Sequence, residues 1–421
     1  MNRNGKARVS FWLVQAIVAA GVGLSAARGG SGRVDLRFWP GKPREVVHIE
    51  RVRPLRMESF YDDPQVVSDD ELASVLKQVQ PRFSPKNLRP NYVEHALRIW
   101  GEDARFSDPD VLSGVQLRDL LIDHGRYLAS WGDRIKPLLV ESREGVEVRW
   151  GREEGASVHH DHWLACLTEA GVALDEPIYT PSQHVRTIND AVQQALRDFQ
   201  IDGREVEWSA MAFGLWLPPT RSWQTADGRT VSFDMLAHRL MRGDKRLGVC
   251  SGTHRVYSIV LLLRLDGLYS ILSDDVRKEM MAHMRSVRQA LIESQFEDGH
   301  WPSNWEKGAE AVKKPIDDTL QKKVIATGHH LEWLALAPEE LHPPREQIRK
   351  AARWAIDTTV SRTPAQILEH FTFYSHVGGA LSLWRKTRAA DFWREHEDQA
   401  TRSAEQAGEA EPESEKIPND E

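Results

Sequence analysis

Residues 253–301, THRVYSIVLLLRLDGLYSILSDDVRKEMMAHMRSVRQALIESQFEDGHW, place two different kinds of helix one after the other in the chain. The segment 256–263 is apolar nearly all round, so its helix must be buried on every side. The next helix opens at Ser273, a residue type favoured at helix N-caps. Its apolar residues share one face and are Val276, Met280, Met284, Val287 and Leu291. A fully buried helix followed by a half-buried one predicts a fold with two layers of helices.

The same alternation continues along most of the chain. Ser68 and Glu71 make a capping box, and Thr187 and Asp190 open another amphipathic helix. The other segments that are apolar nearly all round are 208–217, 331–337 and 379–384. Inner helices that form a barrel and outer helices that cover it explain this pattern, and six such pairs need roughly 300 residues. We therefore predict an all-α fold, an α/α toroid or double-layered ring of helix pairs, over residues 68–395. An α-solenoid and an irregular helical domain are the alternatives.

Three other segments depart from the helical pattern. Residues 138–150, centred on Glu144-Gly145, and residues 221–233, with Asp227-Gly228 as the turn, predict two small β-hairpin insertions. Residues 31–67 carry Gly, Pro and mixed charge, which is typical of a linker. Residues 396–421 are rich in Glu, Ser and Ala, so a disordered acidic tail is expected there.

The N-terminus has the pattern of an export signal. Arg3, Lys6 and Arg8 precede an uncharged apolar run at 9–27, close to the ~20 residues that a membrane helix needs. Ser25-Ala26-Ala27 also fits a signal-peptidase site. We expect residues 1–30 to be a signal anchor or a cleaved signal peptide. The body then lies outside the cytoplasm, held at the cell membrane by a single N-terminal span or, if the segment is cleaved, secreted or periplasmic.

Composition limits the class of partner. The net charge is −7 and no basic run with interleaved aromatic residues is present, which argues against nucleic-acid binding. Fifteen Trp against seven Tyr suit either a large core or a concave pocket. The two cysteines, Cys166 and Cys250, predict free buried thiols or at most a single disulfide.

The segment Gln295-Phe296-Glu297-Asp298-Gly299-His300-Trp301 resembles the Gln–Trp repeat of terpene cyclases and protein prenyltransferase β subunits. Those families are α/α toroids, so the resemblance implies the same fold. In such a repeat Gly299 ends the outer helix and Trp301 stacks on the Gln295 amide. A weaker copy lies at 195–208. The cyclase acid motif Asp-x-Asp-Asp-Thr is incomplete here, because Pro315 replaces its first Asp, and a surface loop is the simpler interpretation of Asp317 and Asp318.

A second segment, Gly328-His329-His330-Leu331-Glu332-Trp333, resembles a motif of the N-acylglucosamine 2-epimerase family, which also forms an α/α ring. The resemblance implies an acid/base role on sugar protons for His329 and a supporting role for Glu332.

Three histidines follow small residues just before apolar runs: His254, His329 and His376. If each opens an inner helix, a ring would bring them to one cavity mouth, where imidazole suits proton transfer or a divalent metal. Cys250 lies four residues before His254 and could share a metal with it. The alternative is a set of helix-start histidines bonded to neighbouring loops. The cluster His159-His160-Asp161-His162 is better explained as a loop entering a helix than as a metal site.

These patterns lead to one functional prediction and one alternative. The predicted catalytic residues are His254, His329, Glu332 and His376, and the predicted substrate-binding residues are Glu207, Trp208, His330 and Trp333. No metal or cofactor is included in this site. We expect acid–base chemistry on a polyprenoid or a glycan in a central cavity. The alternative is a non-catalytic toroid that binds a lipid, a glycan or another envelope protein, and the oligomeric state is not predicted.

Overall fold

A computed structural model describes residues 45–182, 184–243 and 248–409, all within one compact unit, Pro43–Glu421. These residues are mostly helical, with only small two-stranded sheets, as the all-α prediction requires. The apolar run at 9–27 and the last twelve residues lie outside the described part. Within that part, no helix combines the length and the apolar character needed to cross a membrane.

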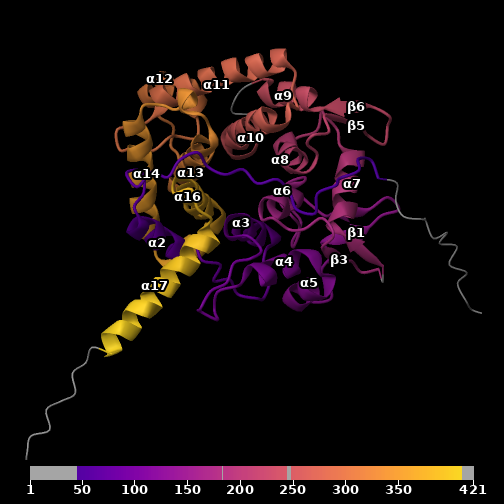
Figure 1. Cartoon of the computed structure of the whole chain (residues 1–421), viewed down its shortest axis with the longest axis horizontal. Coiled ribbons are helices and arrows are strands. Elements are labelled where there is room, and N and C mark those ends of the chain that lie inside the picture. Colours follow the sequence, from indigo (N-terminus) through magenta and orange to yellow (C-terminus); the bar gives the residue numbers. More distant parts are fainter. Residues whose placement is uncertain (1–44, 183, 244–247, 410–421) are drawn as a thin grey trace, which may run out of the picture. The chain divides into compact units, whose positions relative to one another are not determined.

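Six helices that are buried over most of their length form the interior, and we call them the inner helices. They are α3 (Pro90–Trp100), α6 (His162–Glu169), α8 (Val206–Trp216), α10 (Thr253–Tyr269), α13 (Leu320–Leu336) and α16 (Phe371–Trp384). Each packs against the next in this order, and α16 packs against α3 (Figure 1). Every residue of α8 is buried, as its uninterrupted apolar sequence requires.

Six further helices bury one face only, and we call them the outer helices. They are α2 (Asp69–Gln78), α4 (Gly114–Ile122), α7 (Ile188–Asp198), α9 (Phe233–Met241), α11 (Asp274–Ser294) and α14 (Arg345–Val360). The expected N-terminal signals are present: Ser68 and Glu71 form a capping box, as do Thr187 and Asp190, and Ser273 caps α11. The buried residues of α11 include all five that its sequence period predicts.

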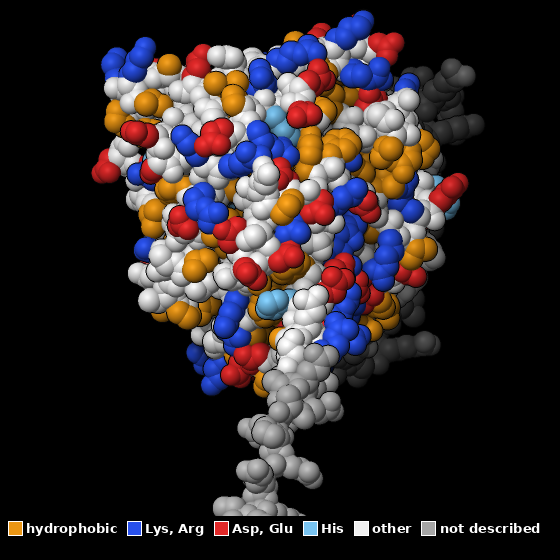
Figure 2. Space-filling model, turned by 60° about the vertical axis from the view of Figure 1, so that its left-hand side comes forward, with side chains coloured by type: hydrophobic (Ala, Val, Ile, Leu, Met, Phe, Trp, Pro, Cys, Tyr) orange, Lys and Arg blue, Asp and Glu red, His pale blue; other side chains and the backbone are white. Residues whose placement is uncertain are grey.

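The remaining helices join or follow these pairs. They are α5 (His124–Trp131), α12 (Ala309–Lys313), α15 (Pro364–Glu369) and α17 (Ala389–Glu409), with short 3-10 turns η1 (Val249–Gly252), η2 (Trp305–Lys307) and η3 (Glu339–Leu341). Helix α17 continues to Glu409, so the described part of the expected tail is helical. Charged side chains of both signs are mixed over the face of the molecule in Figure 2.

Both predicted hairpins are present. Strand β1 (Leu139–Glu141) pairs with β2 (Val146–Val148), and β5 (Ser222–Gln224) pairs with β6 (Thr230–Ser232). Gly228 has φ +79°, the left-handed conformation that the tight turn needs. The count of two hairpins was wrong, because β3 (Pro177–Tyr179) pairs with β4 (Val185–Thr187). The segment between these strands, residues 180–184, lacks the Gly that marks the turns of the other two hairpins in the sequence.

Residues 45–67, expected to act as a linker, lie along the helical domain. Val47, Val66 and Val67 are buried, and the amide of Leu55 donates to the carbonyl of Leu215 at 2.9 Å. The backbone of this segment is therefore anchored to the last turn of the inner helix α8.

Tryptophan side chains tie inner elements to the ends of outer helices. The indole N–H of Trp301 donates to the carbonyl of Leu291, in the last turn of α11, at 3.0 Å, and Trp301 is fully buried. Equivalent bonds of 3.0 to 3.1 Å join Trp100 to Val79, Trp163 to Leu121 and Trp223 to Leu196. Carbonyls near helix C-termini lack intrahelical donors, and these indoles supply them.

The Gln–Trp segment works differently in detail from the expectation. Helix α11 ends at Ser294, not at Gly299, and Gly299 lies in the following turn with φ +106°. A Cβ at Gly299 would lie 2.4 Å from the carbonyl oxygen of Lys350, so a larger residue does not fit there. The Gln295 amide donates to the carbonyl of Gln347, which links α11 to α14. In the weaker copy, Trp208 lies within α8, and Trp223 makes the equivalent helix-end bond.

Candidate functional site

Histidines from five inner helices gather at the centre of the described domain. They are His95, His162, His254, His329 and His376, and each is at most 7% exposed. The ring centroids of His329 lie 4.1 Å from those of His254 and 3.8 Å from those of His376. The structure thus brings together the three histidines predicted from the sequence. Only His254 is near a helix start, however; His329 and His376 lie within α13 and α16, and that part of the prediction was wrong.

Glu332 connects this cluster electrostatically. Its carboxylate oxygens lie 2.7 Å from Nδ1 of His329 and 3.2 Å from Nδ1 of His376. The Arg98 guanidinium donates to the same carboxylate at 3.2 Å and to Glu169 at 2.5 Å. One turn of α13 brings Glu332 and His329 to the same face, as their three-residue spacing predicts.

Burial and charge act on these groups in opposite directions. Burial alone would raise the pKa of Glu332, but Arg98, His376 and His329 hold that pKa well below its usual value. Burial lowers the pKa of His329 and His376, so both imidazoles are neutral. At His329 the ionised carboxylate accepts from Nδ1–H of the neutral imidazole, which leaves Nε2 as the basic nitrogen. Nδ1 of His376 lies between two partners, the Glu332 carboxylate at 3.2 Å and the Arg98 guanidinium at 3.1 Å.

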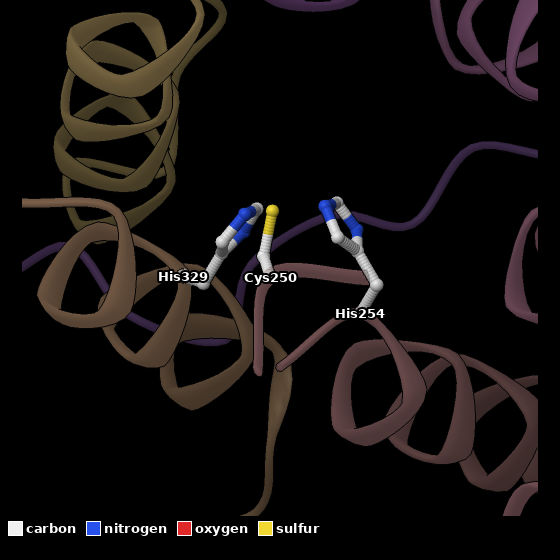
Figure 3. A group of neighbouring side chains, drawn as sticks. All are labelled: Cys250, His254 and His329. Carbon is white, nitrogen blue, oxygen red and sulfur yellow. The ribbon is translucent and has the colours of Figure 1, made fainter. Parts of the chain in front are cut away.

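Several nitrogens at the centre have no hydrogen-bond partner among the described residues. They are both ring nitrogens of His254, Nε2 of His329 and Nε2 of His376. Buried polar atoms in proteins are nearly always paired, so these positions indicate a group that the protein atoms do not supply. Two sets of side chains have ligand atoms within 4.8 Å of one another and could hold a metal: Cys250, His254 and His329, and His329, Glu332 and His376. Figure 3 shows the first set, with the two imidazoles on either side of the sulfur.

An unusual turn holds Cys250 beside these histidines. Cys250 (φ +50°) and Ser251 (φ +58°) are both left-handed, a conformation that costs energy for residues other than Gly. The Glu207 carboxylate accepts from the amide of Val249 at 2.7 Å, and the Trp305 indole donates to the carbonyl of Ser251 at 3.1 Å. Glu207, expected to bind substrate, therefore fixes the turn that carries Cys250.

The other predicted binding residues divide into two groups. The ring of Trp208 lies 4.1 Å from His254 and 4.3 Å from His162, so it forms part of the central cluster. Trp333 instead donates from its indole to Nδ1 of His330 at 2.9 Å. The His330 ring packs against Trp301 and Trp305, away from the Glu332 network.

Two other motifs considered in the sequence have structural roles. Asp318 accepts from both the amide and the hydroxyl of Ser303 at 2.7 Å, and Asp317 is exposed, as expected for a loop. His159 lies 2.9 Å from Glu205 in the turn before α6, so the histidine cluster there is a loop entering a helix.

A second buried constellation, which was not predicted from the sequence, lies on α3 and α6. Sγ of Cys166 lies 3.3 Å from Nε2 of His162, whose Nδ1 contacts the Glu94 carboxyl. Burial raises the pKa of Glu94 to about 8 and lowers that of His162 well below its usual value, so both groups are neutral at neutral pH. The four-residue spacing of His162 and Cys166 was a visible signal. Neither Glu94 nor Arg98 had one, because each is a single charged residue in an amphipathic helix.

A cavity of about 440 Å³ reaches this centre from the surface. Its buried part is lined by Arg98, Glu169, Tyr257 and Glu332, and the more exposed part by Arg53, Arg56 and Arg388. The Tyr257 hydroxyl donates to Glu169 at 2.6 Å. Glu332 thus lies between the cavity and the histidines.

Comparisons of this chain with protein-family models, with curated proteins and with solved structures give no match in any of the three.

Proposed function

We propose that this protein is an enzyme that transfers protons on a glycan substrate, with His376 and Glu332 as the reacting pair. The observation that carries the proposal is the position of Glu332, which lines the cavity and contacts both His329 and His376. Nδ1 of His376 lies 3.2 Å from the Glu332 carboxylate and 3.1 Å from the Arg98 guanidinium. In the tautomer that donates from Nδ1 to Glu332, the carboxylate raises the basicity of Nε2, as proton abstraction needs. Nε2 of His376 has no protein partner and can accept a proton.

We also infer that the fold is an α/α toroid. The closed order of contacts, from α3 through α6, α8, α10 and α13 to α16 and back to α3, supports this arrangement. Outer helices α4, α9, α11, α14 and α2 each pack against at least one inner helix. An α-solenoid would leave its first and last inner helices apart.

The cavity lining favours a glycan over a polyprenoid. The ion-paired groups Arg98, Glu169 and Glu332 face the cavity, and a hydrocarbon chain would have to cover them without offering hydrogen bonds. Sugar hydroxyls can bond to such groups, and Tyr257 supplies an aromatic face beside them. Arg53, Arg56 and Arg388 add positive charge toward the surface, which suits an acidic sugar.

The alternative is a non-catalytic toroid that binds a glycan, a lipid or an envelope protein. One observation favours it: the three imidazoles are at most 1% exposed, and the cavity meets the cluster at the Glu332 and Arg98 side chains, which contact the histidines. The two functions differ in what happens to the bound substrate, so one experiment separates them.

The test follows hydrogen exchange, which reports proton abstraction without knowledge of the product. Neutral and acidic sugars, oligosaccharides and polyprenyl phosphates are incubated with the full chain in D₂O, and loss of C–H signals is measured by NMR. We expect exchange in a sugar, a roughly 10²–10⁴-fold loss in His376→Asn, and little change in the control His330→Asn. Binding without exchange in any compound would support the non-catalytic alternative, and unchanged exchange in His376→Asn would contradict the assigned base.

We further propose that residues 1–30 anchor the protein in the cell membrane with the body outside the cytoplasm. The basic residues Arg3, Lys6 and Arg8 before the apolar run support this orientation. A periplasm-dependent reporter fused after Glu395 should be active, and the same fusion without residues 1–30 should be inactive. Inactivity of the reporter in the full fusion, with the fused protein present in the cell, would contradict the proposal.

A further inference from the structure

We propose that Cys250, His254 and His329 bind one Zn²⁺ ion, with an open coordination position beside His376. The ligand atoms of these three residues all lie within 4.8 Å of one another. A tetrahedral zinc ion holds its ligand atoms about 3.4–3.7 Å apart, so small side-chain rotations complete the site. In Figure 3 the Cys250 sulfur and the imidazoles of His254 and His329 extend to the same region between their helices.

The unpaired nitrogens distinguish this set from its neighbour. In the set His329, Glu332 and His376, both Nδ1 atoms and both carboxylate oxygens have partners within the protein. His254 is 1% exposed, and neither of its ring nitrogens has a partner among the described residues; Nε2 of His329 has none either. Each buried unpaired group costs about 1–3 kcal/mol, and a metal removes that cost. Zinc at the Cys250 set therefore pairs two of these nitrogens, one of His254 and Nε2 of His329.

The surroundings have the features of a second coordination shell. Glu332 contacts Nδ1 of His329 at 2.7 Å and so directs Nε2 toward the Cys250 side, as carboxylates do for metal-bound histidines. Glu207 and Trp305 hold the left-handed turn at Cys250 and Ser251. Backbone strain that is held by buried partners indicates that the position of the Cys250 side chain matters.

The donor types select the metal. One thiolate and two imidazoles suit zinc and similar transition metals, whereas Mg²⁺ and Ca²⁺ prefer oxygen ligands. Three protein ligands leave a fourth position for water or a substrate oxygen, which is the pattern of catalytic zinc sites. A sugar oxygen bound there would be polarised next to His376. The metal site itself does not depend on the proton-transfer function, and metal binding is measured without substrate.

The experiment uses the full chain after treatment with a chelator under reducing conditions. Calorimetric titration with Zn²⁺ should show one ion per chain. Co²⁺ should give the near-ultraviolet charge-transfer band of a thiolate ligand. We expect Cys250→Ser to lose the band, and His254→Gln to bind Zn²⁺ at least 100-fold more weakly. Cys166→Ser, the matched control at the other buried thiol, should behave like the parent chain.

The variant Glu332→Gln tests whether Glu332 orients the His329 ligand without binding the metal itself. It should weaken Zn²⁺ binding roughly 10–100-fold while keeping the thiolate band. The parent chain decides the question even if a variant fails to fold. Absence of stoichiometric Zn²⁺ and Co²⁺ binding by the parent chain, or loss of the band in Cys166→Ser instead of Cys250→Ser, would overturn the proposal. His376→Asn should keep the metal and lose hydrogen exchange, so failure of the proposed function is recognised separately.

Discussion

The tryptophans between inner and outer helices and the histidines at the centre are both buried, but they differ in whether their ring nitrogens have hydrogen-bond partners. The indoles of Trp100, Trp163, Trp223 and Trp301 each donate to a carbonyl near the end of an outer helix. His254, His329 and His376 keep ring nitrogens without a protein partner. Trp208 fits the second group, since it contacts His254 and its indole nitrogen is also unpaired.

This difference separates stability from function. The hydrogen bonds from these four indoles stabilise the contacts between the helices, because each buried donor has an acceptor. Incomplete hydrogen bonding at the centre costs stability and leaves atoms free to bind a metal or accept a proton. Functional sites commonly carry such a cost. The substitutions below should therefore change stability in opposite directions in the two regions.

The largest expected effect is at the helix interface. Trp301→Ala removes a fully buried indole and its bond to Leu291, and should lower the free energy of unfolding by about 3–5 kcal/mol. The measurement is urea unfolding followed by circular dichroism. Trp150→Ala is the control, because Trp150 is 52% exposed and should lose little. A loss below about 1 kcal/mol for Trp301→Ala would contradict the conclusion that the buried, hydrogen-bonded indoles stabilise the helix interface.

A pH-dependent effect is expected from Glu94. Burial raises its pKa from 4.5 to about 8, so between these values the folded state binds a proton that the unfolded state releases. The stability that Glu94 contributes therefore falls as pH rises, by up to about 1.4 kcal/mol per pH unit. Glu94→Gln lacks this loss, so its stability relative to the parent chain should increase from pH 5 to pH 8. A pH-independent difference would mean that Glu94 titrates normally.

The smallest effect has the opposite sign from the first. His254→Met replaces an imidazole with two unpaired nitrogens by an apolar side chain of similar length, and should stabilise the metal-free chain by about 1 kcal/mol. Thermal unfolding in chelator measures the change. A destabilisation of 2 kcal/mol or more would show that the His254 nitrogens are satisfied, and the contrast between the two regions would fail.

The spacing of apolar residues was enough to predict which helices are buried all round and which bury one face, because that property depends on the sequence of each helix alone. The segment 256–263 and the five apolar residues of α11 had the burial expected of them. Capping residues predicted helix starts at Ser68, Thr187 and Ser273 for the same local reason. The third hairpin was missed because its connecting segment, residues 180–184, carries no Gly as a turn signal. The end of α11 was misplaced because Gly299 fits a close backbone approach to Lys350, which is a tertiary contact.

The site was predicted in part. His254, His329, His376 and Glu332 come together as the sequence analysis expected, although the helix-start argument holds only for His254. Arg98 and Glu94 could not be found, because their partners lie on other helices. His330 and Trp333 share a motif with His329 but face the Trp301 side, and only the helix rotation decides this.

The long sequence separations at the centre have a consequence for how the chain folds. Arg98 contacts Glu332 and His376, which are 234 and 278 positions away in the sequence. Such non-local contacts slow folding, because the intervening chain must be ordered before they can form. The polar centre can therefore assemble only after α16 has been synthesised. Until then, the helices synthesised earlier lack some of the partners that bury their apolar faces. If the chain is exported, this delay keeps it unfolded until most of it has emerged, and it predicts dependence on chaperones during that interval.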